Sequence, residues 1–557
     1  MRADTAVLID SDNRRRHALV IDANAVSRTA MVQMMRGLGF RHVRQAQRLR
    51  EARDMLEVRR FDVVVCDNDI APSGASSRNL LDELQQGQPL PHATVFVMVA
   101  GEATYARVTE AAEAALDSYL VKPFTGLLLA ERIGEAQQRK QALLPVFEAL
   151  EANDPARAAQ ICVDRFGQRS PYWLFGARLG AELLLRLKRP QEAHKLYDAA
   201  QAALPQAWAR LGMARAELAS GQLAAARRRL DTLLNDQPDF SDALDVLGQL
   251  QLEQGHLDEA LQTLARVARL TPDCVLRQQQ CGTLAFMCGD MAQATEHLQR
   301  TWDIGRHSRL LDAQTLLLLT LLAHDRGDTP ALARAAAALP PLAAQHPASI
   351  RLQRMLSCTQ VLAATAGLGG LAGPAAEGGG LALARQLAAD HEQPDFDIEA
   401  AVHVLALWTR LPALHKTDPL LGDEVEAVVR GIARRFCVSK AAAELLVRVV
   451  QRHAPAVSWV REMQGEVMHL AEEAMNLALH GDPTAAVRSL LEHGERTRNA
   501  KLIDMAVSVV RRHRERLTDA PRLLGEAGAL AHRYGHGLPL PRLRRHGRMA
   551  GGMALRG

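Results

Sequence analysis

Two patterns of apolar and polar positions divide the chain. In residues 16–137, short apolar runs alternate with amphipathic stretches, which is typical of βα units around a parallel sheet. The apolar runs lie at residues 18–22, 42–46, 62–67, 94–99 and 118–121. Five short strands joined by crossover helices predict one doubly wound α/β domain, preceded by an N-terminal extension at residues 1–15.

From residue 138 onward, helical patterning repeats every 33 or 34 residues. Three residue types keep this period: Ala159, Ala193, Ala226, Ala260 and Ala294; Pro171, Pro205, Pro238 and Pro272; and Gly221, Gly255 and Gly289. Glycine lets the chain turn between two helices, alanine lets them cross closely, and proline ends the second helix. The period predicts an all-α solenoid of paired helices in residues 138–347.

The last third is predicted to be helical but loses this period. Residues 363–380 contain a glycine pattern that follows no convincing strand, so we expect a flexible linker there. Residues 384–535 return to helical patterning, as either degenerate repeats or a separate helical domain. The tail at 536–557 is basic and contains proline and glycine.

Composition and charge exclude several classes of protein. The formal net charge of +4 is small for 557 residues, so no strong field indicates nucleic acid or a membrane surface as a partner. The longest apolar stretch, around residues 315–323, is too short to span a bilayer. No secretory signal is recognisable, and we expect a cytoplasmic protein.

The cysteines also indicate a reducing compartment, because the seven of them include no CxxC pair. Cys274, Cys281 and Cys288 follow one another at seven-residue spacing. On a continuous helix this spacing places them roughly 10 Å apart, too far for shared tetrahedral metal coordination. We expect buried, reduced thiols at these positions.

Charged side chains stand at the ends of the predicted strands. Asp22, Asp67 and Lys122 close the first, third and fifth strands, and Ala100 closes the fourth. The carboxyl ends of parallel strands meet at the edge of the sheet where ligands bind. A carboxylate that ends an apolar run is costly to bury unless it is solvated, paired or bound to a cation, although it can also serve as a helix N-cap. Lys122 supplies the opposite charge, and Pro123 fixes a turn that would aim it inward.

These strand ends resemble the receiver domain of two-component response regulators, over residues 16–137. Four segments carry the resemblance: Val-Ile-Asp at 20–22, Val-Val-Val-Cys-Asp at 63–67, Val-Met-Val-Ala at 97–100 and Tyr-Leu-Val-Lys-Pro-Phe at 119–124. The resemblance implies a five-stranded, chemotaxis-type receiver domain at the head of a signalling protein.

The same resemblance implies a role for each residue at this edge. Asp67 would accept a phosphoryl group from a sensor histidine kinase or a phosphotransfer protein. Asp22, Asp67 and the backbone carbonyl of Asp69 would hold Mg²⁺, and Lys122 would pair with a phosphoryl oxygen. Tyr119 would be the aromatic switch residue.

Two positions depart from the family pattern, and each removes a side-chain oxygen. Ala23 stands where a second acidic residue is usual, which should weaken binding of Mg²⁺ because this ion prefers six oxygens. Ala100 stands where a hydroxyl residue is usual, so the family's link between the phosphoryl group and Tyr119 is missing. The sequence leaves open a degenerate receiver that serves only as a docking surface.

The repeats resemble tetratricopeptide repeats, most fully at residues 247–272. In that family the groove of the superhelix usually holds a peptide or helix from a partner protein, so the resemblance implies an unknown protein partner. Polar side chains on the predicted helix faces, such as Gln249, Gln251 and Gln278, are equally well explained as solvated surface.

Together these patterns predict an adaptor rather than an enzyme, in which phosphorylation of Asp67 alters what the repeats bind. The alternative is a phosphorylation-independent scaffold with an inert receiver. A third hypothesis, a nucleic-acid regulator that uses the basic tail, has less support because no recognisable DNA-binding motif occupies the output position.

Overall fold

The computed structural model describes residues 11–68, 91, 93–101, 117–306, 308, 310–373, 380–411 and 421–534. The N-terminal domain contains one parallel five-stranded sheet in the order β2-β1-β3-β4-β5. Its strands are β1 (His17–Ile21), β2 (His42–Ala46), β3 (Val63–Asp67), β4 (Val95–Ala100) and β5 (Ser118–Val121). The predicted doubly wound α/β fold is confirmed.

Helices cover both faces of this sheet, as the apolar strands require. On one face, α1 (Ala25–Gly37) and α5 (Gly126–Ala142) pack on alternate strand residues such as Val20 and Val65. On the other face, α2 (Leu49–Val58) packs on Leu19 and Val64. A short 3₁₀ helix, η1 (Ser11–Arg14), precedes β1. The central strands β3 and β4 are buried along their whole length.

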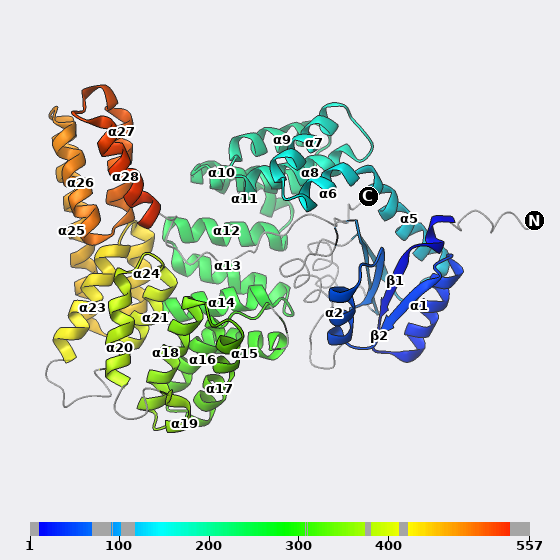
Figure 1. Cartoon of the computed structure of the whole chain (residues 1–557), viewed down its shortest axis with the longest axis horizontal. Coiled ribbons are helices and arrows are strands. Elements are labelled where there is room, and N and C mark those ends of the chain that lie inside the picture. The colour runs from blue at the N-terminus through cyan, green and yellow to red at the C-terminus, as the bar shows by residue number, and fades with distance from the viewer. Residues whose placement is uncertain are drawn as a thin grey trace, which may run out of the picture.

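The helical array begins without a break after the sheet domain, because α5 continues through residues 137–138 to Ala142. Its helices are α6 (Leu144–Glu151), α7 (Pro155–Gly167), α8 (Trp173–Arg186), α9 (Pro190–Ala203), α10 (Ala207–Ala219), α11 (Leu223–Asp236), α12 (Ser241–Gln254), α13 (Leu257–Leu270), α14 (Val275–Cys288), α15 (Met291–Gly305), α16 (Gln314–Asp325) and α17 (Thr329–Gln345). Neighbouring helices pack against one another in chain order and form a curved stack (Figure 1).

The periodic residues have the structural roles that the sequence predicted for them. The five periodic alanines, such as Ala260, are buried where the two helices of a pair cross. Gly255 and Gly289 end α12 and α14 in the left-handed conformation, with φ of 80° and 83°. That conformation is costly for any residue with a Cβ atom, so glycine determines where each helix pair turns.

The last third adds further helices: α18 (Ile350–Thr365), α19 (Gly369–Ala372), α20 (Gly380–Ala389), α21 (Ile398–Trp408), α23 (Leu421–Phe436), α24 (Lys440–Val450), α25 (Ala454–Leu479), α26 (Pro483–Thr497), α27 (Ala500–Arg512) and α28 (Ala520–Tyr534). Helices up to the first half of α25 share one hydrophobic core with α13 to α16 of the array. The second half of α25 packs with α26, α27 and α28 around a separate core. Residues 380–463 thus extend the array.

One expectation about this part of the chain differs from the structure, and another concerns residues that the structure does not describe. Of the expected linker at 363–380, residues 363–365 end α18 and 369–372 form α19, with Ala363 and Ala372 buried against each other's helices. Residues 374–379 and the basic tail at 536–557 lie outside the described residues. Burial of apolar side chains here outweighs the low helix propensity of glycine.

The polar array residues also differ from the solvated surface that was considered for them. Gln251 and Gln278 are buried. The Nε2 atom of Gln278 donates to the carbonyl of Ala268 at 2.9 Å, and its Oε1 atom lies 2.8 Å from Nδ1 of His297. Gln278 therefore satisfies backbone groups between helices, as a buried amide must. Gln249, which is half-buried, bonds to Glu253.

The cysteine expectation is confirmed, because all seven thiols are buried and free. Burial raises the pKa of both Cys281 and Cys288 to about 12, so these thiols stay protonated. Within the described ranges, no group of three His, Cys, Asp or Glu side chains is arranged to hold a metal ion. In the same part of the chain, no helix is long and apolar enough to cross a membrane.

Candidate functional site

Asp22, Asp67 and Lys122 lie together at the carboxyl edge of the sheet. The Nζ atom of Lys122 lies 3.1 Å from Oδ2 of Asp22 and forms an ion pair with Oδ2 of Asp67. Both carboxylates are nearly enclosed, at 2% exposed for Asp22 and 6% for Asp67. One ammonium group thus joins two buried carboxylates that are 45 residues apart in the chain.

The strand order explains how Lys122 reaches the carboxylates. β1 and β3 are neighbours, so Asp22 and Asp67 emerge side by side, whereas β4 separates β3 from β5. β4 ends at Ala100, whose carbonyl accepts a hydrogen bond from the Lys122 amide at 2.8 Å. The Lys122–Pro123 peptide is cis.

The charge state of Lys122 follows from these neighbours. Its partial burial, acting alone, would lower the pKa of the ammonium group. The hydrogen bonds and negative charges of Asp67 and Asp22 outweigh that effect and raise the pKa above its ordinary value. Lys122 therefore stays protonated throughout the physiological pH range.

Arg28 is a member of this site that sequence reasoning missed. It lies in α1 among buried apolar residues, and its Nη1 atom donates to the carbonyl of Asp22 at 2.7 Å. The other oxygen of the Asp22 carboxylate, Oδ1, accepts from the amide of Asn24 at 2.7 Å. These contacts hold both the backbone and the side chain of Asp22. The sequence signal is an arginine on the helix face that Met31 and Met35 otherwise make apolar.

Of the predicted switch pair, Ala100 lies at this edge without the customary hydroxyl, and Tyr119 lies two residues further back along the sheet, beside Met98. Ala100 is fully buried at the end of β4. Tyr119, in β5, is half-buried and packs on the sheet face that carries α2, beside Phe96 and Met98. Because a methyl group cannot form a hydrogen bond, a relay from the Asp67 edge to Tyr119 would have to use another group.

Two carboxylates at this edge could serve as ligands for Mg²⁺. Asp22 and Asp67 each have a carboxylate at this edge, and Ala23 adds no oxygen from its side chain. Proteins often hold Mg²⁺ through only one or two carboxylates, with waters and phosphate oxygens completing the shell. The two carboxylates therefore fit the ion with a reduced set of protein ligands. Asp69, whose backbone was expected to contribute, lies outside the described residues.

A second cluster of buried charges lies at the opposite end of β5. Asp117 precedes the strand, and its two carboxylate oxygens lie 3.1 Å from Nη2 of Arg139 and 2.9 Å from Nζ of Lys140. The amide of Phe96 donates to the same carboxylate at 2.8 Å. The guanidinium of Arg139 also lies over the ring of Phe175 in α8, 5.1 Å from the ring centroid. This junction connects the sheet to the array.

The junction was not predicted, although the sequence contains a signal for it. Arg139 and Lys140 are both buried in the last turn of an amphipathic helix, where basic residues are normally exposed. Burial lowers the pKa of Lys140, and the charge of Asp117 offsets only part of that effect. Such burial shows that the carboxylate is required as a counter-charge.

Comparisons with known proteins agree with this fold. The model of the response regulator receiver domain matches residues 18–134, and the model of the tetratricopeptide repeat matches residues 184–250. Chemotaxis protein CheY-3 of Vibrio cholerae is 31% identical over 127 residues, which cover 23% of this chain and 95% of that protein. Chemotaxis protein CheY of Pseudomonas aeruginosa is 32% identical over 121 residues, which cover 22% of this chain and 95% of that protein.

The two relatives are matched over nearly their whole length by the N-terminal domain alone. The helices that follow have the period and turns of tetratricopeptide repeats. The chain therefore belongs to the response regulator family, with an N-terminal receiver domain followed by tetratricopeptide repeats.

Proposed function

We propose that the protein is a phosphorylation-controlled adaptor. Asp67 accepts a phosphoryl group, and this modification changes how the helical array binds a partner protein. The contact of Lys122 with both Asp67 and Asp22 is the observation that carries the proposal. A buried carboxylate next to a permanent cation at the ligand-binding edge of a parallel sheet suits transfer of an anionic group.

In the proposed reaction, a carboxylate oxygen of Asp67 attacks the phosphorus of a phosphohistidine on a sensor kinase or phosphotransfer protein. The new O–P bond forms as the P–N bond breaks, and the imidazole leaves with the bonding electron pair. Lys122 stabilises the charge on the phosphoryl oxygens. When bound by Asp22 and Asp67, Mg²⁺ would supply further positive charge at the same place.

The route to the array is proposed to run through β5 and α5. Lys122 follows β5 directly, and Asp117 precedes it, so this four-residue strand has the site at one end and the junction at the other. α5 begins near the site at Gly126 and ends at the junction. A phosphoryl group that draws Lys122 away from Asp22 would shift the positions of β5 and α5. This route needs no relay through Ala100.

The partner is proposed to bind the first helices of the early pairs. α8 contacts α10 and α10 contacts α12, so these helices form one surface, whereas α24 already contacts α12 and α14. An ion pair lies between α8 and α10, where Arg215 is 3.7 Å from Glu182 and both side chains are partly exposed. Such a charged pair favours a polar peptide or helix of a protein as the ligand.

The second candidate function is a scaffold whose receiver is inert. Ala23 and Ala100 favour it, because each lacks an oxygen that the family's switch employs. The two functions differ in one observable, which is a covalent adduct on Asp67.

The deciding experiment incubates the full chain with acetyl phosphate and Mg²⁺ and measures its intact mass. The adaptor predicts one added phosphoryl group in the wild type and none in Asp67→Asn. Asp62→Asn is a matched control, because Asp62 precedes the same strand at its other end and bonds to the His17 amide. A wild-type chain that gains no phosphoryl mass with Mg²⁺ or Mn²⁺ would support the inert scaffold.

A further inference from the structure

We propose that a cluster of arginines at the amino edge of the receiver sheet is a docking site for an acidic segment of a partner protein. The cluster, called the arginine rim below, consists of Arg14, Arg15, Arg36 and Arg41. It lies at the opposite edge of the sheet from Asp67 and is independent of the phosphoryl chemistry proposed above.

The arginine rim is assembled from two turns. Arg14 ends η1 and Arg15 follows it, just before β1. Arg36 lies in the last turn of α1, and Arg41 immediately precedes β2. Because β1 and β2 are neighbouring parallel strands, the segments before them meet at one edge.

All four guanidinium groups of the arginine rim lack an ion-pair partner in the part of the chain that the structure describes. Their side chains are exposed. By contrast, the buried Arg277 is paired with Asp245. Four like charges without counter-charges repel one another, and an anionic ligand would relieve that repulsion.

The charge is local to this part of the molecule. Residues 11–68 contain twelve arginines and seven aspartates or glutamates, whereas the whole chain has a formal net charge of only +4. The field of this end of the receiver is therefore positive although the protein is nearly neutral. Such a field raises the rate at which an oppositely charged segment arrives.

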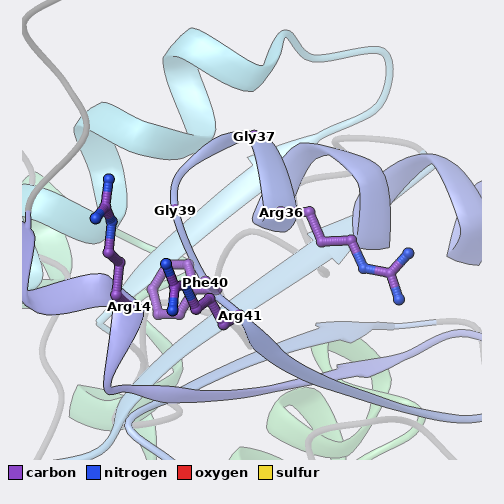
Figure 2. A pocket seen from close by; sticks show the side chains of 6 residues that line it. All are labelled: Arg14, Arg36, Gly37, Gly39, Phe40 and Arg41. Atoms are coloured by element: carbon purple, nitrogen blue, oxygen red, sulfur yellow. The ribbon is translucent and has the colours of Figure 1, made fainter.

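A shallow pocket lies within the rim, lined by Arg14, Arg36, Arg41, Gly37, Gly39 and Phe40, with a volume of about 450 Å³. In Figure 2 the guanidinium group of Arg41 overlaps the Phe40 ring in the view, that of Arg14 lies apart from it, and Arg36 extends along α1 away from both. The three groups do not converge on one point. A single small anion could not reach all of them, but an extended acidic chain could.

The rim suits an acidic protein segment better than nucleic acid. Its aromatic side chain, Phe40, is only 1% exposed and offers no surface on which a base could stack. Four arginines can pair with a few glutamates or aspartates in bidentate geometry.

The test measures binding of a fluorescent peptide of ten glutamates to the full chain by anisotropy at low salt. Arg14→Ser/Arg41→Ser is expected to weaken binding about five- to ten-fold, since each exposed ion pair contributes modestly. Arg511→Ser/Arg512→Ser removes the same charge from exposed positions at the end of α27 and should leave affinity unchanged. Arg14 and Arg41 are both exposed, so circular dichroism should show that the double variant is folded.

Three outcomes would overturn the inference. One is that the wild type does not bind the peptide, and another is that the two double variants lose affinity equally, which would indicate a general charge effect. The third is that a DNA duplex, but not the peptide, depends on Arg14 and Arg41. Asp67→Asn should bind the peptide like the wild type, so failure of the phosphorylation proposal would leave this result unaffected.

Discussion

The carboxylate of Asp117 lies 3.1 Å from the guanidinium of Arg139, and this pair joins the receiver to the repeat array. Asp117 stands before β5, Arg139 stands near the end of α5, and both are buried. The same guanidinium rests on Phe175 of the array. An arginine that contacts both units limits how freely one can turn against the other.

Replacing Asp117 is expected to loosen this junction. Asp117→Ala would leave Arg139 and Lys140 buried without their carboxylate, and breaking a buried ion pair on one side costs about 3–5 kcal/mol. Hydrogen exchange followed by mass spectrometry should show faster exchange in β5 and α5. Asp231→Ala removes a carboxylate that pairs with Arg227 at the surface and should change exchange little. Equal protection in both variants would show that the junction is not maintained by this charge.

Lys122 is expected to be needed for phosphorylation but not for folding of the array. Lys122→Ala removes the cation that joins Asp22 and Asp67, and losing one preorganised charge at a reacting group slows such reactions about 10²-fold or more. The measurement is the rate of phosphoryl incorporation from acetyl phosphate by intact mass. Lys195→Ala, an exposed lysine of α9, is the control and should react at the wild-type rate. Unchanged incorporation in Lys122→Ala would remove the lysine from the mechanism.

Replacing Gly255 by alanine is expected to disturb the packing of α24 on the turn that follows α12. A methyl group at Gly255 would lie 3.2 Å from Cα of Ala441, the second residue of α24, and φ there is 80°. Gly221 has a similar φ of 74°, but a methyl group there meets nothing within 4 Å. Both alanine variants should lose about 1 kcal/mol from the left-handed conformation. Gly255→Ala should lose more, because the backbone of α24 must move.

This comparison is read from urea unfolding midpoints of the two variants. A larger loss in Gly255→Ala, with faster hydrogen exchange in α24, is the expected result. If Gly221→Ala and Gly255→Ala unfold alike, α24 does not rest on that turn in solution.

His403 is expected to make the array less stable in mild acid. Burial and the charge of Arg351 lower the pKa of His403 to about 3, and its Nε2 atom lies 3.0 Å from Nε2 of Gln314. The unfolded chain takes up a proton near the ordinary pKa of about 6.5, whereas the folded chain does not. Stability is therefore complete above that pH and falls as the pH drops toward 3, by about 1.4 kcal/mol per unit for one proton.

The check is His403→Gln, whose side-chain oxygen can still accept from Gln314 but cannot be protonated. Its stability should fall less steeply between pH 6 and pH 4 than that of the wild type, as followed by urea unfolding. His346→Gln replaces an exposed histidine at the end of α17 and should keep the wild-type slope. Identical slopes in all three proteins would mean that His403 is protonated in the fold.

The site edge could be predicted because its signals are local. Asp67 ends an apolar strand, Lys122 ends another, and the rule that parallel strands present their carboxyl ends at one edge brings them together. The contributions of Arg28 and of the Asp117 junction could not be predicted in this way. Each depends on which buried group lies opposite, and that is set by helix packing rather than by the spacing of residues.

In the helical array, too, local signals could be predicted and contacts between distant helices could not. The period of Gly255 and Ala260 determined where helix pairs turn and cross, since backbone conformation and close contact act within one repeat. The glycine content of residues 363–373 predicted a flexible linker, whereas most of these residues are helical. The prediction was wrong because the burial of Ala363 and Ala372 depends on neighbours from other helices.

By itself, the sequence determined the doubly wound sheet, the repeat period and the grouping of Asp22, Asp67 and Lys122, because these follow from patterns within short stretches. Only the tertiary structure decided that α24 docks on the array, where Arg448 pairs with Asp258 at 2.7 Å across 190 residues of chain. It also decided that β5 connects the site to the junction. Contacts of this kind depend on side chains that folding brings together from distant segments, and such pairs follow no periodic pattern along the chain.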